Sequence, residues 1–176
     1  MSMFNMSNLI DASFAFSDCQ SLESMYLPEQ MLSLELTNNM FKNCLNLTKI
    51  NLEFLRGASQ LKSSIGMFFG CISLNEINFP LINTTSLKDI SGMFLGCSSL
   101  TSINLEGLIA RNINSMDFMF YDCKNLIYLN IYNLNTENEP DCNQIFEGVP
   151  KNIYIKYNRL YTGVLLLKQI ESLSHE

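Results

Sequence analysis

The sequence predicts an α/β repeat solenoid with a parallel sheet of about six short strands, irregular convex arms and a C-terminal helix. Three observations lead to this prediction. The pattern F-x-x-C-x-x-L-x-x-(I/L/M)-x-(L/I/F) recurs along most of the chain, the apolar residues at the end of each unit alternate as in a strand, and the last residues have the spacing of a helix. Each unit has one apolar side, which only its neighbours can cover.

The repeat is anchored by a column of phenylalanines. Successive units begin 25, 27, 26, 26 and 26 residues apart. In the first five units a cysteine follows the phenylalanine by three residues, and a leucine follows the cysteine by three more. The columns are Phe16, Phe41, Phe68, Phe94, Phe120 and Phe146; Cys19, Cys44, Cys71, Cys97 and Cys123; and Leu22, Leu47, Leu74, Leu100 and Leu126.

The end of each unit predicts a strand, because successive side chains of a strand point to opposite faces. In "LTSINL", Ile103 and Leu105 therefore face the core, whereas Ser102 and Asn104 face outward. The outward residues of all units would line a concave sheet, which is the usual binding surface of a solenoid. The partner-binding candidates are Tyr26, Lys49, Asn51, Glu76, Asn78, Ser102, Asn104, Tyr128, Asn130 and Tyr154.

Four of these outward residues form one column of asparagines, and two hypotheses describe it. The stacked amides could hydrogen-bond to one another along the sheet. The column could instead be a weakly charged recognition strip edged by tyrosines, which are favoured in interfaces. Both can hold at once for Asn51, Asn78, Asn104 and Asn130.

The arm that returns from each strand is too irregular for a long helix, so we expect loops with short helical or 3₁₀ turns that end in the Met-Phe pair. The last segment differs. Leu160, Val164, Leu167 and Ile170 lie near helical spacing and predict a helix of about ten residues or more. The predicted division is a solenoid of about five and a half units over residues 1–158, followed by a capping or docking helix over 159–176.

The unit M-F-x-x-C-x-x-L-T-x-(I/L)-x-L, joined by N-(T/S)-x-x-(L/I)-x-x-(M/I)-x-x-M-F, resembles the BspA-like leucine-rich-repeat family, in its branch with units of about 26 residues. The resemblance runs from about Phe4 to Ile155. The last unit departs most, with Val149 in the cysteine column, Glu139 in an apolar column and two residues deleted before Ile153. The resemblance implies adhesion or protein binding at a surface, and no catalysis.

Six cysteines in a short chain can form a disulfide framework. In stacked coils, however, equivalent side chains lie roughly 4.8 Å apart and point the same way, so bridging would distort the stack. We therefore interpret the column as small apolar side chains that fit where the arm turns into the strand. Zinc is disfavoured because no C-x-x-C pair exists and His175 is the single histidine. Cys142 lies outside the column, and the sequence assigns it no role.

Composition argues against several classes of function. The net charge of -6 and the pI near 4.8 argue against nucleic acid and anionic membrane surfaces. No stretch approaches the roughly 18 apolar residues of a membrane-spanning helix. The chain has no recognisable nucleophile motif, and "LKSSIGMFFG" lacks the spacing of a phosphate-binding loop. We therefore expect no catalysis, no cofactor and no metal.

The sequence thus predicts a non-enzymatic protein-binding or adhesion module that uses the concave face. The alternative is a structural spacer or scaffold segment of a longer surface protein, self-associating through its N-terminal open end or its C-terminal helix. The open end is expected because the sequence starts within a unit and shows no polar cap there. The compartment stays open, because the resemblance implies a cell surface or secretion whereas reduced cysteines favour the cytosol.

Overall fold

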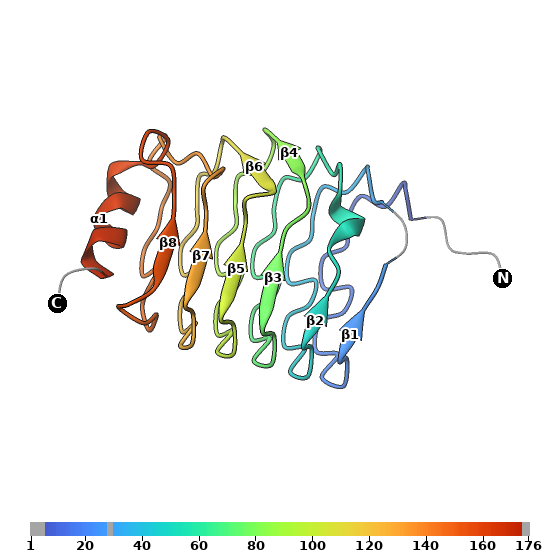
Figure 1. Ribbon diagram of the computed structural model, residues 1–176. Helices are drawn as coiled ribbons and strands as arrows, with labels where there is room; N and C mark the ends of the chain where they lie inside the picture. The colour runs from blue at the N-terminus through green and yellow to red at the C-terminus, as the bar shows by residue number, and fades with distance from the viewer. Residues whose placement is uncertain (1–5, 28–29, 174–176) are drawn as a thin grey trace.

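The computed structural model describes residues 6–27 and 30–173, and it shows a solenoid of stacked coils (Figure 1). Phe4 and His175 lie outside the described residues. Each coil contributes one short parallel strand to the same face, and equivalent residues pair in register, as Ile77 does with Ile103. The six strands are Ser24–Met25 (β1), Lys49–Ile50 (β2), Glu76–Asn78 (β3), Ser102–Asn104 (β5), Tyr128–Asn130 (β7) and Tyr154–Lys156 (β8). The predicted fold is confirmed.

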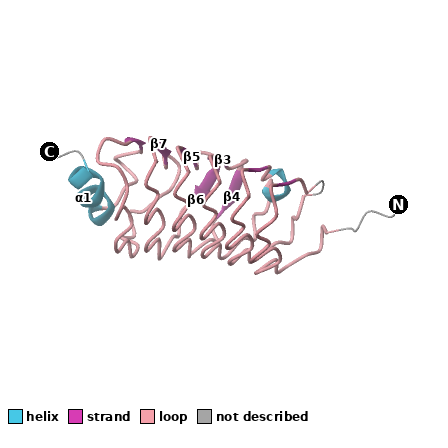
Figure 2. Ribbon diagram, turned by 90° about the horizontal axis from the view of Figure 1, so that it is seen from below, coloured by secondary structure: helices cyan, strands magenta, loops and turns pink. Residues whose placement is uncertain are grey.

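The arms, expected to be irregular, repeat regularly from coil to coil (Figure 2). Ile82–Thr84 (β4) pairs with Leu108–Ala110 (β6), and this short parallel sheet lies apart from the six strands. A further column of single parallel bridges connects Asp11, Leu36, Ser63, Asp89, Ser115 and Asp141 in succession. The Met-Phe turns are also joined, since the Phe68 N–H donates to the Met93 carbonyl at 2.9 Å. Backbone hydrogen bonds between coils therefore replace those that a helix would make within an arm.

Two positions in each turn have a left-handed backbone, two residues before and two residues after the column phenylalanine. Gly66 and Gly70 occupy them in the third coil with φ of 57° and 72°, and Asn39 and Asn43 occupy them in the second with 54° and 56°. Glycine and asparagine enter this region at the lowest cost. Phe118 adopts φ of 56° in the same column, which is an unfavourable backbone conformation for a bulky residue.

The core is built on the stacked phenylalanine column. The Phe41 and Phe68 rings lie 5.5 Å apart with an angle of 3° between their planes, and the Phe120 and Phe146 rings lie 5.7 Å apart. The stack runs through all six coils, and the rings of its four inner coils are fully buried. The methionine before each inner phenylalanine is also buried. Aromatic stacking and apolar burial hold the coils together along the solenoid axis.

The column cysteines are free thiols with a more specific role than filling space. Each buried Sγ donates to the carbonyl oxygen of the phenylalanine one coil earlier, as Cys97 does to Phe68 at 3.0 Å. Burial raises the pKa of Cys44 to about 11 and that of Cys71 to about 12. The column therefore stays protonated, and each thiol gives a second hydrogen bond to a carbonyl that already accepts the backbone N–H of the cysteine in its own turn, as Phe68 does from Cys71 at 3.1 Å. The four bonded thiols are Cys44, Cys71, Cys97 and Cys123.

The C-terminal helix, Val164–Leu173 (α1), lies against the last coil and buries Leu166 and Ile170 (Figure 1). Its first turn is held by Glu139, whose carboxylate accepts the N–H of Val164 at 2.7 Å and of Leu165 at 2.9 Å. These N–H groups have no partner within a helix, and a negative charge there is stabilising. Glu139 therefore departs from its apolar column because it anchors the helix.

The expected deletion before Ile153 is wrong. Strand β8 keeps the register of the earlier coils, so that Ile155 pairs with Leu129. The turn that starts at Phe146 has the same length as the others, and its Val149 N–H donates to the Phe146 carbonyl at 3.1 Å. Asn152 consequently takes the place of the column leucine.

Candidate functional site

The six strands lie along one side of the solenoid, which we call the strand face. It carries the outward residues predicted from the alternation. Tyr26 and Tyr154 are its most exposed tyrosines, with 68% and 62% of their surface accessible. Nine of the ten candidates are exposed or half-buried on this face: Tyr26, Lys49, Asn51, Glu76, Asn78, Ser102, Asn104, Tyr128 and Tyr154.

Asn130 is the exception, because it is fully buried and the expectation that it points into solvent is wrong. Its Nδ2 donates to Glu106 Oε2 at 2.9 Å, and its Oδ1 accepts the Tyr132 N–H at 3.1 Å. Lys156 lies on the next strand and forms an ion pair with Glu106 at 3.1 Å. The Lys156 ammonium and then the Asn130 amide lower the pKa of Glu106. Lys156 was missed because the assumed deletion shifted the last strand.

The asparagine column does not form a ladder of amides. In the described part of the chain no hydrogen bond joins two of its members. Instead, three of the four accept the backbone N–H two residues later: Asn51 Oδ1 accepts the Glu53 N–H at 2.8 Å, Asn104 Oδ1 accepts the Glu106 N–H at 3.1 Å, and Asn130 makes the same turn. Such turns are a common use of asparagine where a strand ends.

Asn78 cannot make this turn. The residue two positions later is Pro80, which has no backbone N–H. The Asn78 side chain is exposed and has no hydrogen-bond partner among residues 6–27 and 30–173. Its acceptor oxygen and its two donor hydrogens are therefore available to a ligand.

The strand face is interrupted beside Asn78. Strands β1 and β2 form one sheet, β3, β5, β7 and β8 form another, and β2 is not hydrogen-bonded to β3. The unit from Phe41 to Phe68 is one residue longer than the three that follow it. Directly after β2 this unit forms a 3₁₀ turn, Glu53–Leu55, which Figure 1 shows next to the end of the strand. The extra residue thus coincides with the break in the sheet.

A hollow of about 530 Å³ lies over this break. Half of the predicted partner-binding residues line it, which are Tyr26, Lys49, Asn51, Glu76 and Asn78. The side chains of Lys49 and Glu76 form no ion pair with any described residue. The hollow therefore gathers one cationic, one anionic and one amide side chain that pair with no other described residue.

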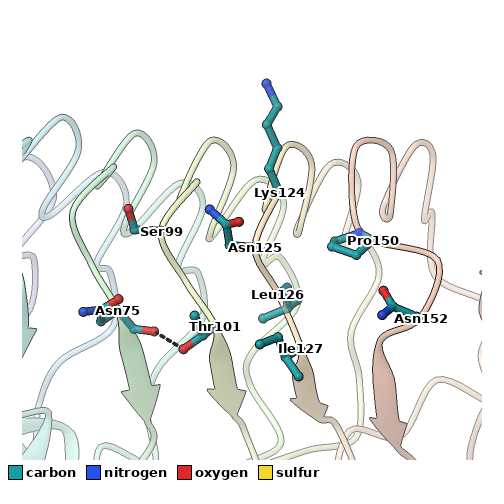
Figure 3. A pocket seen from close by; sticks show the side chains of 9 residues that line it. All are labelled: Asn75, Ser99, Thr101, Lys124, Asn125, Leu126, Ile127, Pro150 and Asn152. Carbon is teal, nitrogen blue, oxygen red and sulfur yellow. Dashed lines mark hydrogen bonds between the residues drawn. The ribbon is translucent and has the colours of Figure 1, made fainter.

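A second hollow, of about 440 Å³, lies where the chain enters strands β5, β7 and β8 (Figure 3). Its polar groups serve the stack, since the Thr101 hydroxyl donates to the Asn75 carbonyl at 3.2 Å and Asn125 donates to the Ser98 carbonyl at 2.8 Å. The Lys124 side chain points away from it in Figure 3. None of the predicted partner-binding residues lines this hollow, which we interpret as a groove between loops.

The C-terminal part of the strand face is aromatic and internally paired. The Tyr128 and Tyr154 rings stack with centroids 5.8 Å apart and an angle of 9° between their planes. The Lys156 ammonium lies 5.3 Å from the Tyr132 ring centre while it pairs with Glu106. This end therefore offers a tyrosine surface, whereas the hollow near β2 and β3 offers charges.

The described residues contain no grouping of His, Cys, Asp and Glu that could hold a metal ion. The carboxylates of the arms serve turns, as Asp11 and Asp89 accept the N–H groups of Ser13 and Ser91 at 2.8 and 2.9 Å. Burial raises the pKa of the inner column thiols, so these cysteines are poor nucleophiles. No helix in the described ranges is long and apolar enough to cross a membrane.

Comparison with known families agrees with this architecture. A family model described as a BspA type leucine rich repeat region matches in six copies, over residues 10–107 and 62–148. No curated protein and no solved structure matches the chain significantly. The matched residues include all six phenylalanines of the column and five of the six strands. The chain belongs to the BspA-type leucine-rich-repeat family.

Proposed function

We propose that this chain is a non-enzymatic module that binds another protein or a cell-surface component through its strand face. The observation that carries the proposal is the hollow over the break between β2 and β3. Lys49, Glu76 and Asn78 meet there with polar groups that no described residue satisfies. Tyrosine is enriched in interfaces and polar groups form their rim, so exposed tyrosines beside polar groups without a described partner support this face as the recognition surface.

The arms provide a contrast that supports this choice of face. Many of their polar side chains connect one coil to the next, as the hydroxyls of Ser91 and Ser115 do at 2.7 Å. The Asn143 amide likewise bonds to Asp117 at 3.0 Å. Substituting such residues would weaken the hydrogen bonds between coils, and so the fold itself, whether or not a partner binds there. The strand face can change its side chains with less effect on the fold.

The test is a triple variant, Lys49→Ala with Glu76→Ala and Tyr128→Ala, in a pull-down from the native source followed by affinity measurement on the captured protein. We expect lost binding with an unchanged melting temperature. The matched control is Ile72→Ala with Lys88→Ala and Glu147→Ala, which changes exposed residues of the arms and turns. Equal binding by both triple variants would contradict the proposal.

A second candidate is a structural spacer within a longer stack, and the N-terminal edge favours it. The carbonyls of Asn38, Met40 and Lys42 each accept an N–H from the coil before. The equivalent carbonyls of the first coil, Ser13, Ala15 and Ser17, accept none from the described residues. Cys19 is exposed, although its four equivalents are buried. The N-terminal edge therefore exposes the same row of carbonyls that each inner coil uses to bind the coil before it, so a further coil could stack on this edge.

The spacer hypothesis also includes self-association, through this edge or through α1, whose Val164 and Leu165 are exposed. Light scattering across a range of concentrations, combined with the rate of Cys19 alkylation, tests it. A mass that rises with concentration while Cys19 becomes protected supports the edge. A rising mass that Leu165→Lys abolishes supports the helix. A constant monomer mass with a reactive Cys19 excludes self-association.

A further inference from the structure

We propose that the hollow between β2 and β3 binds an extended polypeptide segment. The segment would place an acidic side chain on Lys49, a basic side chain on Glu76 and a peptide group on Asn78. This inference rests on the proposed function and narrows its site from the whole strand face to one interruption of the sheet.

The two charges are the first step. Lys49 and Glu76 begin strands of successive coils, in a column whose neighbouring members are Ser24 and Ser102. Other charges near this face are already paired, such as Lys156 with Glu106 and Arg56 with Glu53. A ligand with a single charge would satisfy one of the two groups and face the other unpaired. A segment that carries both signs matches both.

A direct pair between Lys49 and Glu76 would not prevent this binding. Ion pairs between exposed side chains contribute little to stability, because water and salt screen them. A ligand that carries two opposite charges replaces the one Lys49–Glu76 ion pair with two ion pairs to itself. Breaking the internal pair therefore costs little, and the two new pairs discriminate against ligands whose charges have the wrong sign.

The amide is the second step, and it points to a peptide. A carboxamide has one acceptor oxygen and two donor hydrogens, which match the N–H and C=O of a peptide group. Asn51 and Asn104 commit their oxygens to turns at 2.8 and 3.1 Å, whereas Pro80 has no backbone N–H and no residue of 6–27 or 30–173 donates to the Asn78 oxygen. Of the column, Asn78 is therefore the member able to receive a ligand N–H while it donates to a ligand carbonyl.

The geometry is the third step. Neighbouring strands lie about 4.8 Å apart, while side chains on one side of an extended segment repeat at about 6.8 Å. Strands β2 and β3 are adjacent but not hydrogen-bonded, so the spacing of paired strands does not hold between them. The long Lys49 and Glu76 side chains can adjust to residues two positions apart on a segment that crosses both strands. The exposed Tyr26 ring forms one rim of the hollow and adds apolar contact. The volume of about 530 Å³ lies within the usual range of ligand sites.

The experiment pans a displayed library of random octapeptides against the wild-type chain and against the charge-reversed variant K49E/E76K. The control is K88E/E147K, which reverses two exposed charges of the arms and leaves the net charge unchanged. We expect enriched peptides with an acidic and a basic residue two positions apart. The charge-reversed variant should bind them about tenfold more weakly and select the opposite order, since two attractive contacts become repulsive. The control should bind them as the wild type does.

The remaining outcomes separate this inference from the proposed function. Peptides without such a pair of charges, or with affinities that charge reversal leaves unchanged, overturn the inference. If Y128A/Y154A abolishes their binding, the strand face still binds and the proposed function stands. If the chain binds to a glycan array and N78A abolishes that binding, the ligand of the hollow is a sugar, and the proposal of a peptide ligand is overturned. Melting temperatures of all variants within the error of the wild type confirm that folding is intact.

Discussion

The Cys71 Sγ donates a hydrogen bond of 3.0 Å to the carbonyl oxygen of Phe41, one coil earlier. The same contact recurs at each buried thiol of the column, so a side chain that looks like a small apolar filler also closes the backbone of the preceding turn. A thiol fits this position because it is compact and only weakly polar.

Removing one of these thiols should therefore destabilise the stack. We expect Cys97→Ala to lower the free energy of unfolding by about 1–2 kcal/mol, because it removes buried contacts and one of the two hydrogen bonds that the Phe68 carbonyl accepts. Chemical denaturation measures the change. Cys19→Ala, at the exposed end of the column, is the control and should stay within about 0.5 kcal/mol of the wild type. Equal losses in the two variants would contradict the role of the bond.

The thiol pKa values predict a fall in stability at alkaline pH. The pKa of Cys71 and Cys123 is raised to about 12 in the folded chain, chiefly by burial, against an ordinary value of 9.0. Above pH 9 the unfolded chain loses protons that the folded chain keeps, so the free energy of unfolding should decrease from pH 9 to pH 12. Urea titrations at several pH values measure it. A double variant, Cys71→Ala with Cys123→Ala, should have a shallower decrease, and an identical slope would refute the assignment.

Glu139 should control the attachment of α1. The N–H groups of Leu165 and Val164 lower the pKa of its carboxyl, so its stabilising effect is present above the ordinary pKa of 4.5 and is lost as pH falls through the lowered value. We expect Glu139→Gln to speed amide hydrogen exchange in residues 164–173 at neutral pH, with little change in the inner coils. Glu147→Gln, on an exposed turn, is the control. Unchanged exchange in the helix would show that Leu166 and Ile170 hold it without the carboxylate.

Pro80 should keep Asn78 available. Pro80→Ala supplies the missing backbone N–H, and we expect the Asn78 oxygen to accept it, as the Asn104 oxygen accepts the Glu106 N–H. Nuclear magnetic resonance of the variant should show a protected amide at residue 80, and peptides selected on the wild type should bind more weakly. Asn78→Ala should reduce binding to a similar extent. If Pro80→Ala has a protected amide at residue 80 and still binds the peptides as the wild type does, a free Asn78 oxygen is not needed for binding, and the prediction is contradicted.

The sequence predicted the structure well at positions where a residue packs against the equivalent residues of the neighbouring coils. The columns of phenylalanine, cysteine and leucine face equivalent residues one coil away, so their spacing predicted both the strands and the core. Asn130 was misplaced because its burial depends on Glu106 and Lys156, which come from other coils. Periodicity alone does not show which neighbouring side chains close over a position.

The hollow could not be predicted from the repeat because it arises where the repeat is broken. Its signals were present as a step of 27 residues and as a proline two positions after Asn78. Only the structure shows that these two irregularities follow adjacent strands and border the same hollow. Glu139 is a similar case, since its departure from the apolar column was visible but its partner helix had no assigned position.

The turns that join the coils give the solenoid an electrical direction. In the phenylalanine column, the backbone N–H groups of Phe16, Phe68 and Phe94 all donate to carbonyls of the following coil. Their peptide dipoles therefore add head to tail, as they do along an α-helix. Within the described residues the carbonyls of Ser13 and Ala15 end this row of hydrogen bonds at the N-terminal edge, which is its negative pole. If the N-terminal edges of two copies met at these turns, carbonyl oxygens would face carbonyl oxygens and repel one another. The edge is therefore suited to bind a cation or a row of N–H donors.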